Sequence, residues 1–415
     1  MDADNAYLEA IRHGRYSEQV KGLRCKYDHV RIQFEDFITS YYLRPHLEDI
    51  LKGKVKEGDE GLRFYDLGCG TGDGYDLLSR IARKTRLSQF DTRLIQEEMV
   101  DHYKGVDLNV ALLKEARSLF GHYEHVDFCK GDFSNGLPVD EGEDPYDLYF
   151  TSYGTLSHCT DDELEKLFTD IGKHANNGSL ILGDFIGRYS YEWQDLWTHN
   201  PKKEPFMDYL INYLYDEEDR ENIEISSFPM RLMTPEELNP ILNHAAEKAG
   251  VKLEVLRYFD RSLFVGRHIE TGTYNGNPQP LRLMVSSLFE RGLRTYFPDL
   301  KVDFKPRPGF DWQNEALRTL AESWNNLVDY TMVLMKHYDS DEELLPYPPQ
   351  TEVKPLELAY RVMRQTLEGS RGLYGDIRAD VVEAQLVYAI RSLEMNLQNG
   401  RGLGHGLITI IKVVK

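Results

Sequence analysis

The feature that most constrains the fold of this chain is a cluster of glycines directly after a short apolar stretch. The stretch from Leu62 to Leu67 has the pattern of a buried strand, and Gly68, Gly70 and Gly72 follow it. Glycine has no Cβ, so its backbone can adopt positive φ and lie close to a ligand. A helical pattern comes next, with an apolar side formed by Tyr75, Leu77, Leu78 and Ile81. The sequence therefore predicts a strand, a ligand-facing turn and a helix in succession.

The spacing of these glycines distinguishes dinucleotide cofactors from a nucleoside cofactor without phosphate. Dinucleotide-binding turns have the spacing G-x-G-x-x-G and hold a pyrophosphate at the helix N-terminus. This chain has G-x-G-x-G, with Asp66 two residues before the first glycine. A carboxylate is an unfavourable neighbour for a pyrophosphate, whereas S-adenosylmethionine has no phosphate and has an amino group that Asp66 can organise. An ordinary glycine-rich turn without a ligand is the alternative.

Acidic residues follow the next two apolar stretches. Asp107, followed by Leu108, ends the second stretch, where an acid can accept hydrogen bonds from both ribose hydroxyls of a nucleoside. Asp107 lies farther from the glycines than the ribose-binding acid of the dinucleotide motif does. We therefore expect an insertion over residues 85 to 103. Asp132 and Phe133 follow the third stretch, where the acid can accept the adenine amino group and the aromatic ring can contact adenine.

With these motifs in order, residues 60 to 270 resemble the class I S-adenosylmethionine-dependent methyltransferase family. Asp66 to Gly72 are similar to its first motif, Asp107 to its ribose-binding acid, Gly131 to Phe133 to its adenine-site motif, and Tyr146 to Tyr153 to its fourth strand. The resemblance implies S-adenosylmethionine as the cofactor. It also implies an α/β, Rossmann-like fold with a seven-stranded, mostly parallel sheet and a reversed final hairpin.

The same resemblance suggests how the chain is divided. Lys252 to Tyr258 and Arg261 to His268, joined around Asp260, are the expected strands of the final hairpin. After this hairpin, Pro- and Gly-containing connectors separate helical patterns, and Leu407 to Val414 has the pattern of a strand. The predicted domains are an N-terminal helical cap (1–60), a methyltransferase domain (61–270) with a substrate-lid insertion (about 187–240), and a mainly helical C-terminal domain (271–415).

Residues after the fourth and fifth apolar stretches are the candidates for chemistry. Ligands of open α/β sheets bind beyond the carboxyl ends of the strands, which places Thr151 beside the cofactor and selects His158 and Asp184 for catalysis. Methyl transfer requires an aligned nucleophile whose proton is removed where necessary. His158 is the candidate base, although it could instead cap the helix expected from Asp161 or bind substrate. Asp184 could orient an amine or hydroxyl, or simply end its strand.

The insertion after the fifth stretch is strongly aromatic. Its rings could form a lid over a planar or cationic substrate, because aromatic faces attract ammonium groups. Arg188 could bind a substrate carboxylate in a bidentate manner, with a surface ion pair as the alternative. The i,i+4 spacing of Trp193 and Trp197 also fits plain packing. The predicted substrate-binding residues are Tyr153, Arg188, Tyr189, Tyr191, Trp193 and Trp197.

Composition limits the partners of the chain. A net charge of −20 disfavours nucleic acid, because binding to that polyanion depends on Lys and Arg. No apolar run approaches the roughly 20 residues of a membrane span, and the first residues do not resemble a signal peptide, so we expect a cytoplasmic protein without a membrane partner. The cysteines have no metal-site spacing, and no metal is expected; they are Cys25, Cys69, Cys129 and Cys159.

These observations predict an enzyme that transfers a methyl group from S-adenosylmethionine to an O or N nucleophile of a small molecule. A protein methyltransferase is the first alternative, with the C-terminal domain docking the target. A cofactor-binding scaffold that does not catalyse is the second. The C-terminal domain could equally pack on the catalytic body, form a homodimer interface or contribute to the substrate pocket.

Overall fold

The structure is a computed structural model, and it describes most of the chain. Cys25 and part of the insertion predicted over residues 85 to 103 lie outside the described residues. The described residues are 3–15, 26–57, 61–83, 93–215, 217–223, 225–276, 279–340 and 344–415.

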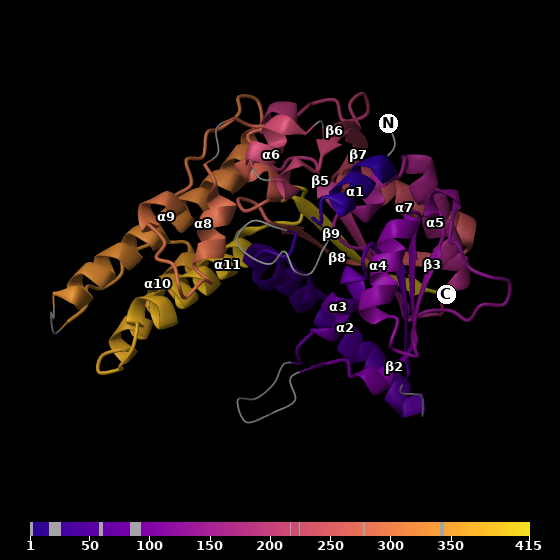
Figure 1. The fold of residues 1–415 in the computed structure, drawn as a ribbon, viewed down its shortest axis with the longest axis horizontal. Coiled ribbons are helices and arrows are strands. Elements are labelled where there is room, and N and C mark those ends of the chain that lie inside the picture. The colour runs from indigo at the N-terminus through magenta and orange to yellow at the C-terminus, as the bar shows by residue number, and fades with distance from the viewer. Residues whose placement is uncertain are drawn as a thin grey trace.

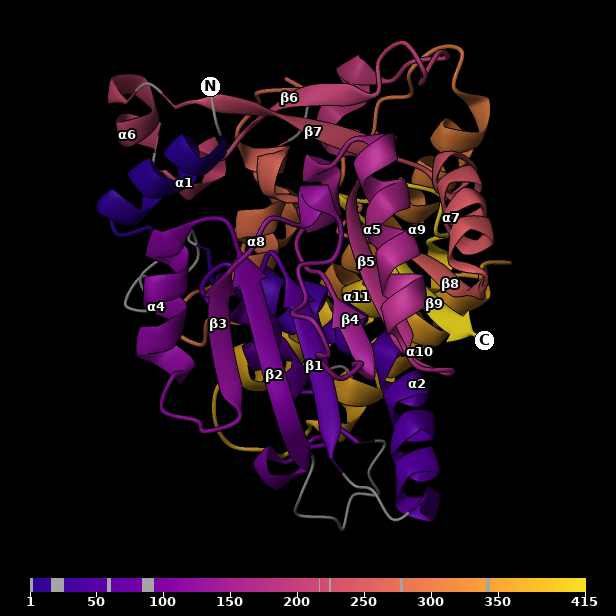
Figure 2. The same cartoon turned by 90° about the vertical axis from the view of Figure 1, so that its right-hand side faces the viewer.

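A mostly parallel sheet forms the centre of the molecule. Its strands lie in the order β3-β2-β1-β4-β5-β9-β8, and within this series β9 alone runs in the direction opposite to the other strands. Figure 2 shows the parallel strands side by side. The predicted fold class is confirmed. The strand bounds are β1 Leu62–Leu67, β2 Val100–Asp107, β3 Val126–Lys130, β4 Leu148–Phe150, β5 Leu180–Gly187, β8 Lys252–Arg261 and β9 Gly406–Val414.

Alternation along the strands builds a core on each face of the sheet. Successive side chains of a strand point to opposite faces, so Phe64 and Tyr65 of β1 belong to different buried clusters. The Phe64 face is covered by α2 and α3, and the Tyr65 face by α5 and α7. The bounds of these helices and of α4, which packs against β3, are α2 Asp36–Glu57, α3 Asp73–Ser79, α4 Val110–Phe120, α5 Asp161–His174 and α7 Pro235–Ala249.

The return strand of the final hairpin comes from the end of the chain. β8 pairs with β9 from Lys252↔Val414 to Arg261↔Gly406, and β9 also pairs with β5. The prediction that Arg261 to His268 forms this strand is wrong. Ser262 has a φ of +62°, and Glu394 accepts its backbone N–H, so the chain turns away where β8 ends.

A helical segment therefore connects the last two strands of the sheet. Helices α9, α10 and α11 pack together, and Figure 1 shows them extending away from the sheet. This region is mainly helical, as predicted, although the division of the chain into three domains stays a prediction. The bounds are α8 Leu281–Ser287, α9 Asp311–Asp339, α10 Lys354–Gly369 and α11 Ala384–Leu397.

Two further segments lie over the end of the sheet at which β5 finishes. A hairpin of β6 (Phe206–Leu210) and β7 (Ser227–Met233) joins the sheet through Ile186↔Leu232 of β5 and β7. Helix α1 (Ala3–Arg12) contacts α4 and β7, as Figure 2 also shows, and α6 (Glu217–Asn222) lies between the hairpin strands in sequence. None of the described helices is both long enough and apolar enough to cross a bilayer.

Candidate active site

A cavity of about 500 Å³ lies where β1, β2, β3 and β4 end. Its walls come from the glycine turn, from the residues after β2, β3 and β4, and from α1 and the β6–β7 hairpin. This is the edge at which ligands of open α/β sheets bind. The cavity brings together the following predicted residues: Gly68, Gly70, Asp107, Leu108, Asp132, Phe133, Tyr153 and His158.

The glycine turn forms the floor of the cavity because its backbone needs conformations that suit glycine. Gly68, Gly70 and Gly72 have φ values of +68°, +54° and +87°. A Cβ on Gly68 would overlap the side chain of Thr155, whereas a Cβ on Gly70 would meet no protein atom within 4 Å. Gly70 thus leaves open space beside the cavity, where a flat ligand can approach the backbone. Gly72 does not line the cavity and instead packs closely under Phe120.

Asp107 is held in a fixed orientation at the end of β2. Its Oδ2 accepts the N–H of Gly70 at 2.9 Å, and its Oδ1 accepts the N–H of Asn109 at 2.8 Å. The Asp107 side chain also lines the cavity. Asp107 therefore links the glycine turn to β2 and presents a carboxylate to a ligand in the cavity.

Asp132 and Phe133 form a second part of the wall. Asp132 Oδ1 accepts hydrogen bonds from the N–H and the hydroxyl of Ser134, and Oδ2 accepts from the Asn135 side chain. The Ser134 hydroxyl is the main cause that lowers the pKa of Asp132. Phe133 is buried, while Leu108 is 42% exposed although it is apolar. These side chains give the cavity an apolar slot with an ionised acceptor at its edge.

Three residues predicted to contact the cofactor do not line the cavity. Asp66 is fully buried beneath the turn, where the Tyr103 hydroxyl donates to it and burial raises its pKa to about 8. Thr151 is also buried, and its hydroxyl donates to the carbonyl of Leu182 at 3.0 Å. Gly72 is the third. Thr151 thus ties β4 to β5, and Asp66 lies beneath the turn.

Asp184, a predicted catalytic residue, also lies outside the cavity lining. It accepts the backbone N–H groups of Tyr153 at 2.8 Å and Gly154 at 3.0 Å, and it forms a buried ion pair with Arg261 at 2.8 Å. Tyr153 has a φ of +56°, so these bonds hold a strained backbone. Asp184 thus positions Tyr153, which does line the cavity.

The aromatic residues after β5 pack into the core. Trp193 Nε1 donates to the carbonyl of Gly187, Trp197 Nε1 donates to that of Ser190, and the Tyr191 hydroxyl donates to that of Asp303. Tyrosine and tryptophan commonly bury their rings while bonding their polar atom in this way. Tyr191, Trp193 and Trp197 do not line the cavity.

Two other predicted substrate contacts also lie elsewhere. Arg188 is fully buried and forms a bidentate pair with Glu237, with N–O distances of 2.7 and 2.8 Å. Tyr189 is half-buried against Trp197 and Trp312. The Arg188 guanidinium is therefore occupied within the fold, and we do not propose it as a carboxylate site.

The aromatic residues that do line the cavity come from other places. Tyr7 of α1, Tyr213 beside β6, and Phe228 of β7 face it together with His158. The His158 ring stacks on Phe228 with centroids 5.4 Å apart, and Tyr7 meets His158 edge-on at 6.3 Å. Burial among these rings lowers the pKa of His158 to about 4, so the ring is neutral at pH 7.

Three cations also line the cavity, and sequence motifs did not single them out as a group. Lys26 Nζ lies 2.7 Å from Asp73, and Arg31 lies 3.2 Å from the same carboxylate. Burial lowers the pKa of Lys26 to about 8, against the opposing effect of Asp73. Arg31 also lies over the ring of Tyr153, with its guanidinium carbon 4.1 Å from the centroid. The third cation, Arg267, donates to the carbonyl of Lys26 at 3.2 Å.

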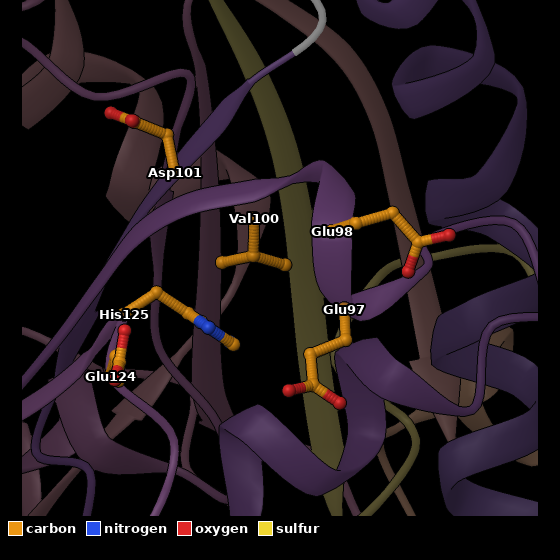
Figure 3. Close-up of a pocket in the computed structure, with 6 residues that line it drawn as sticks. All are labelled: Glu97, Glu98, Val100, Asp101, Glu124 and His125. Carbon is orange, nitrogen blue, oxygen red and sulfur yellow. The ribbon is translucent and has the colours of Figure 1, made fainter.

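A second hollow lies at the opposite end of the sheet, near the start of β2. Figure 3 shows its side chains pointing in different directions. Over the described ranges, no group of three or more His, Cys, Asp or Glu side chains could hold a metal ion. The hollow is lined by Glu97, Glu98, Val100, Asp101, Glu124 and His125.

Comparison with known proteins gives distant structural matches. No protein-family model and no curated protein sequence matches the chain. An S-adenosylmethionine-dependent methyltransferase from Clostridium acetobutylicum ATCC 824 is 17% identical, with a TM-score of 0.34, and the match covers 55% of this chain and 83% of that one. CalS10, an amino pentose methyltransferase from Micromonospora echinaspora, is 15% identical, with a TM-score of 0.33 and coverages of 63% and 93%. These likenesses are too distant to support an argument about chemistry, which depends on the cavity itself.

Proposed function

We propose that this protein transfers a methyl group from S-adenosylmethionine to an oxygen or nitrogen nucleophile of a small molecule. The observation that supports this most directly is the convergence of the glycine turn, Asp107 and Asp132 on one cavity. The cavity lies at the carboxyl edge of the parallel sheet, where such folds bind nucleosides. Its volume of about 500 Å³ is within the usual range for small-molecule sites.

The cavity residues suggest where each part of the cofactor binds. In this proposal the ribose hydroxyls donate to Asp107, and the adenine lies in the slot formed by Leu108 and Phe133, with its amino group near Asp132. The methionine end then lies along the turn from Gly68 to Gly70. S-adenosylmethionine supplies a positively charged sulfonium, which makes the methyl group easy to transfer to a nucleophile.

His158 is better suited to hydrogen bonding than to strong base catalysis. A general base is most effective when its pKa is near the working pH, whereas burial lowers the pKa of His158 to about 4. The neutral ring can accept a hydrogen bond from the acceptor molecule and thereby align its nucleophile. We therefore retain His158 as a proposed substrate contact that orients the reacting atom.

The covering of the cavity favours a small acceptor over a protein target. Tyr7 from α1 and Tyr213 and Phe228 from the hairpin region stand over the site, so an acceptor must fit among aromatic side chains. Docking of a protein through the C-terminal region stays an alternative, as does a homodimer formed by the same region. A scaffold that binds the cofactor without catalysis is the other alternative, and it differs from the proposed enzyme in showing no turnover.

Calorimetry with S-adenosylmethionine and S-adenosylhomocysteine tests the proposal. We expect saturable binding of both to the folded full-length chain. A screen of methyl transfer to amines, phenols, carboxylates and peptides should then give turnover with a small molecule. If neither nucleoside binds to protein that is folded by circular dichroism, the proposal is wrong. Binding without turnover on any acceptor would favour the scaffold.

A further inference from the structure

The cations that line the cavity fall into two sets. Lys26 and Arg31 both contact Asp73, which itself lines the cavity. Arg267 instead faces Glu35, at an N–O distance of 3.7 Å. That distance is beyond hydrogen-bonding range. Arg267 is therefore not paired in the way that the other two cations are.

The carboxylate opposite Arg267 is already occupied. Glu35 Oε1 accepts from Arg282 at 2.7 Å and from the hydroxyl of Ser262 at 2.9 Å. Arg282 is itself held by both oxygens of Asp28, at 2.6 and 2.7 Å. Glu35 therefore accepts a hydrogen bond from Arg282, whereas Arg267 lies too far from it to donate one.

The Arg267 guanidinium has few partners for a buried cation. Its side chain is 9% exposed, and a guanidinium has five N–H donors. Among the residues that the structure describes, one hydrogen bond from this guanidinium is seen, to the carbonyl of Lys26 at 3.2 Å. Burying a cation without hydrogen-bond acceptors is costly. A ligand with anionic oxygens would supply the missing acceptors.

The backbone on either side of Arg267 is fixed by a buried carboxylate. Glu192 accepts the backbone N–H of His268, and its other oxygen lies 2.6 Å from His405 Nδ1. A Cβ on Gly266 would overlap this carboxylate, so the loop passes directly over it. The loop therefore presents Arg267 to the cavity in a set position, which lowers the cost of binding a ligand there.

An aromatic wall runs from Arg267 to His158. The guanidinium carbon of Arg267 lies 5.2 Å from the centroid of the Tyr213 ring. Tyr209 links Tyr213 to Phe228, with centroid distances of 6.4 and 5.8 Å, and Phe228 stacks on His158 at 5.4 Å. A cation at one end of an aromatic wall suits a ligand with an anionic group and a planar or apolar body.

We propose that the methyl acceptor is a small organic oxyanion, a carboxylate or a phosphate ester, whose anionic group binds Arg267. Its planar or apolar body lies along Tyr213 and Phe228 and brings the nucleophile beside His158. This inference depends on the proposed function, because it assigns the Arg267 side of the cavity to the acceptor and the Asp107 side to the cofactor.

The test uses full-length protein saturated with S-adenosylhomocysteine and titrated with aromatic probes. Benzoate and phenyl phosphate carry the two anionic groups, and benzamide is the neutral probe of the same shape. We expect at least one anion to bind about tenfold more tightly than benzamide, because charge-assisted hydrogen bonds to a guanidinium are strong. Comparison of the two anions shows whether carboxylate or phosphate is preferred.

Substitution of Arg267 identifies the source of the preference. Arg267→Met should abolish it, and Arg267→Lys should retain part of it, since a lysine keeps the charge but not the bidentate geometry. Arg257→Met is the matched control, because Arg257 is an exposed residue of β8 outside the cavity. The control should bind the probes as the wild type does.

The cofactor's own carboxylate is the other anion that could reach Arg267. Binding of S-adenosylhomocysteine is therefore compared with that of 5′-methylthioadenosine, which lacks the carboxylate. If Arg267→Met weakens only S-adenosylhomocysteine, Arg267 binds the cofactor and the inference is wrong. Equal binding of anions and benzamide also overturns it. Failure of S-adenosylhomocysteine to bind the wild type would instead reject the proposed function.

Discussion

Single residues define the cofactor side of the cavity, and Asp107 is the most informative of them. We expect Asp107→Ala to weaken binding of S-adenosylmethionine about tenfold to one hundredfold, because hydrogen bonds to an ionised acceptor are strong. Its bonds to the N–H groups of Gly70 and Asn109 are lost as well, so the turn also becomes less ordered. Isothermal titration calorimetry measures the effect.

Asp101→Ala is the control for this substitution on the same strand. Asp101 belongs to β2 but lies away from the cavity, where it forms a surface pair with Arg63 at 3.0 Å. The Asp101→Ala substitution removes the same charge as Asp107→Ala does. It therefore reports any general electrostatic effect on binding of the cationic cofactor. Equal affinities for Asp107→Ala and wild type would show that the ribose does not bind at Asp107.

Residue types near the turn could be read from the sequence because their contacts are local. Gly68 and Gly70 come just after β1, Asp107 is the last residue of β2, and all three line the cavity. The sequence did not place Arg188, because its partner Glu237 belongs to a separate helix. Tyr7 was missed for a similar reason, since α1 reaches the cavity through long-range packing on α4 and β7.

At the scale of secondary-structure elements, Asp66 couples β1 to the helix after the glycine turn. A Cβ on Gly74 of α3 would overlap its carboxylate, and burial raises its pKa from 3.8 to about 8. The folded state therefore binds a proton more tightly than the unfolded state. The resulting stability is fully present below pH 3.8 and is lost as the pH rises through 8, at about 1.4 kcal/mol per pH unit between these values.

Urea unfolding of wild type and Asp66→Asn between pH 5 and 8 measures this loss, over a range chosen from the raised pKa of about 8. Asparagine does not titrate, so the stability of the variant relative to wild type should rise with pH. Glu394, whose pKa burial also raises to about 8, titrates in both proteins and cancels in the difference. Parallel pH profiles would show that Asp66 is ionised in the folded state at neutral pH.

The strands before the active site were easier to predict than the last ones. β1 and β5 are short, mostly apolar runs, which is typical of buried parallel strands; Gly68 follows β1, and Gly187 ends β5. The pattern from Arg261 to His268 is similarly apolar, yet Ser262 turns the backbone and Glu394 of α11 binds it. That carboxylate lies far along the chain, so a local pattern could not reveal the end of β8.

At the scale of the whole molecule, the end of the chain completes the sheet. β9 lies between β5 and β8 and is buried along most of its length. The helices α8 to α11 precede β9 in the chain, so they are packed within a connection between neighbouring strands. Contacts from Arg282 and Glu394 tie this connection to residues near the cavity. We therefore expect the sheet and the helical segment to unfold as one cooperative unit.

Ile410→Ala tests this expectation. Ile410 of β9 is fully buried, and its backbone pairs with Leu182 of β5 and Arg257 of β8. Removing its side chain should lower the free energy of unfolding by about 2–5 kcal/mol, because the loss of buried apolar atoms leaves a cavity. Lys412→Ala, at an exposed position of the same strand, should change it little. Unfolding is followed by two probes in the same urea titration. One is the helical circular dichroism signal, and the other is the fluorescence of Trp324 in α9, in a variant whose other tryptophans are replaced by phenylalanine. We expect the transitions seen by the two probes to shift together. If Ile410→Ala shifts the circular dichroism transition of the whole chain but leaves the Trp324 transition where it was, the helical segment is an independent unit, and the C-terminal strand closes the sheet without stabilising what precedes it.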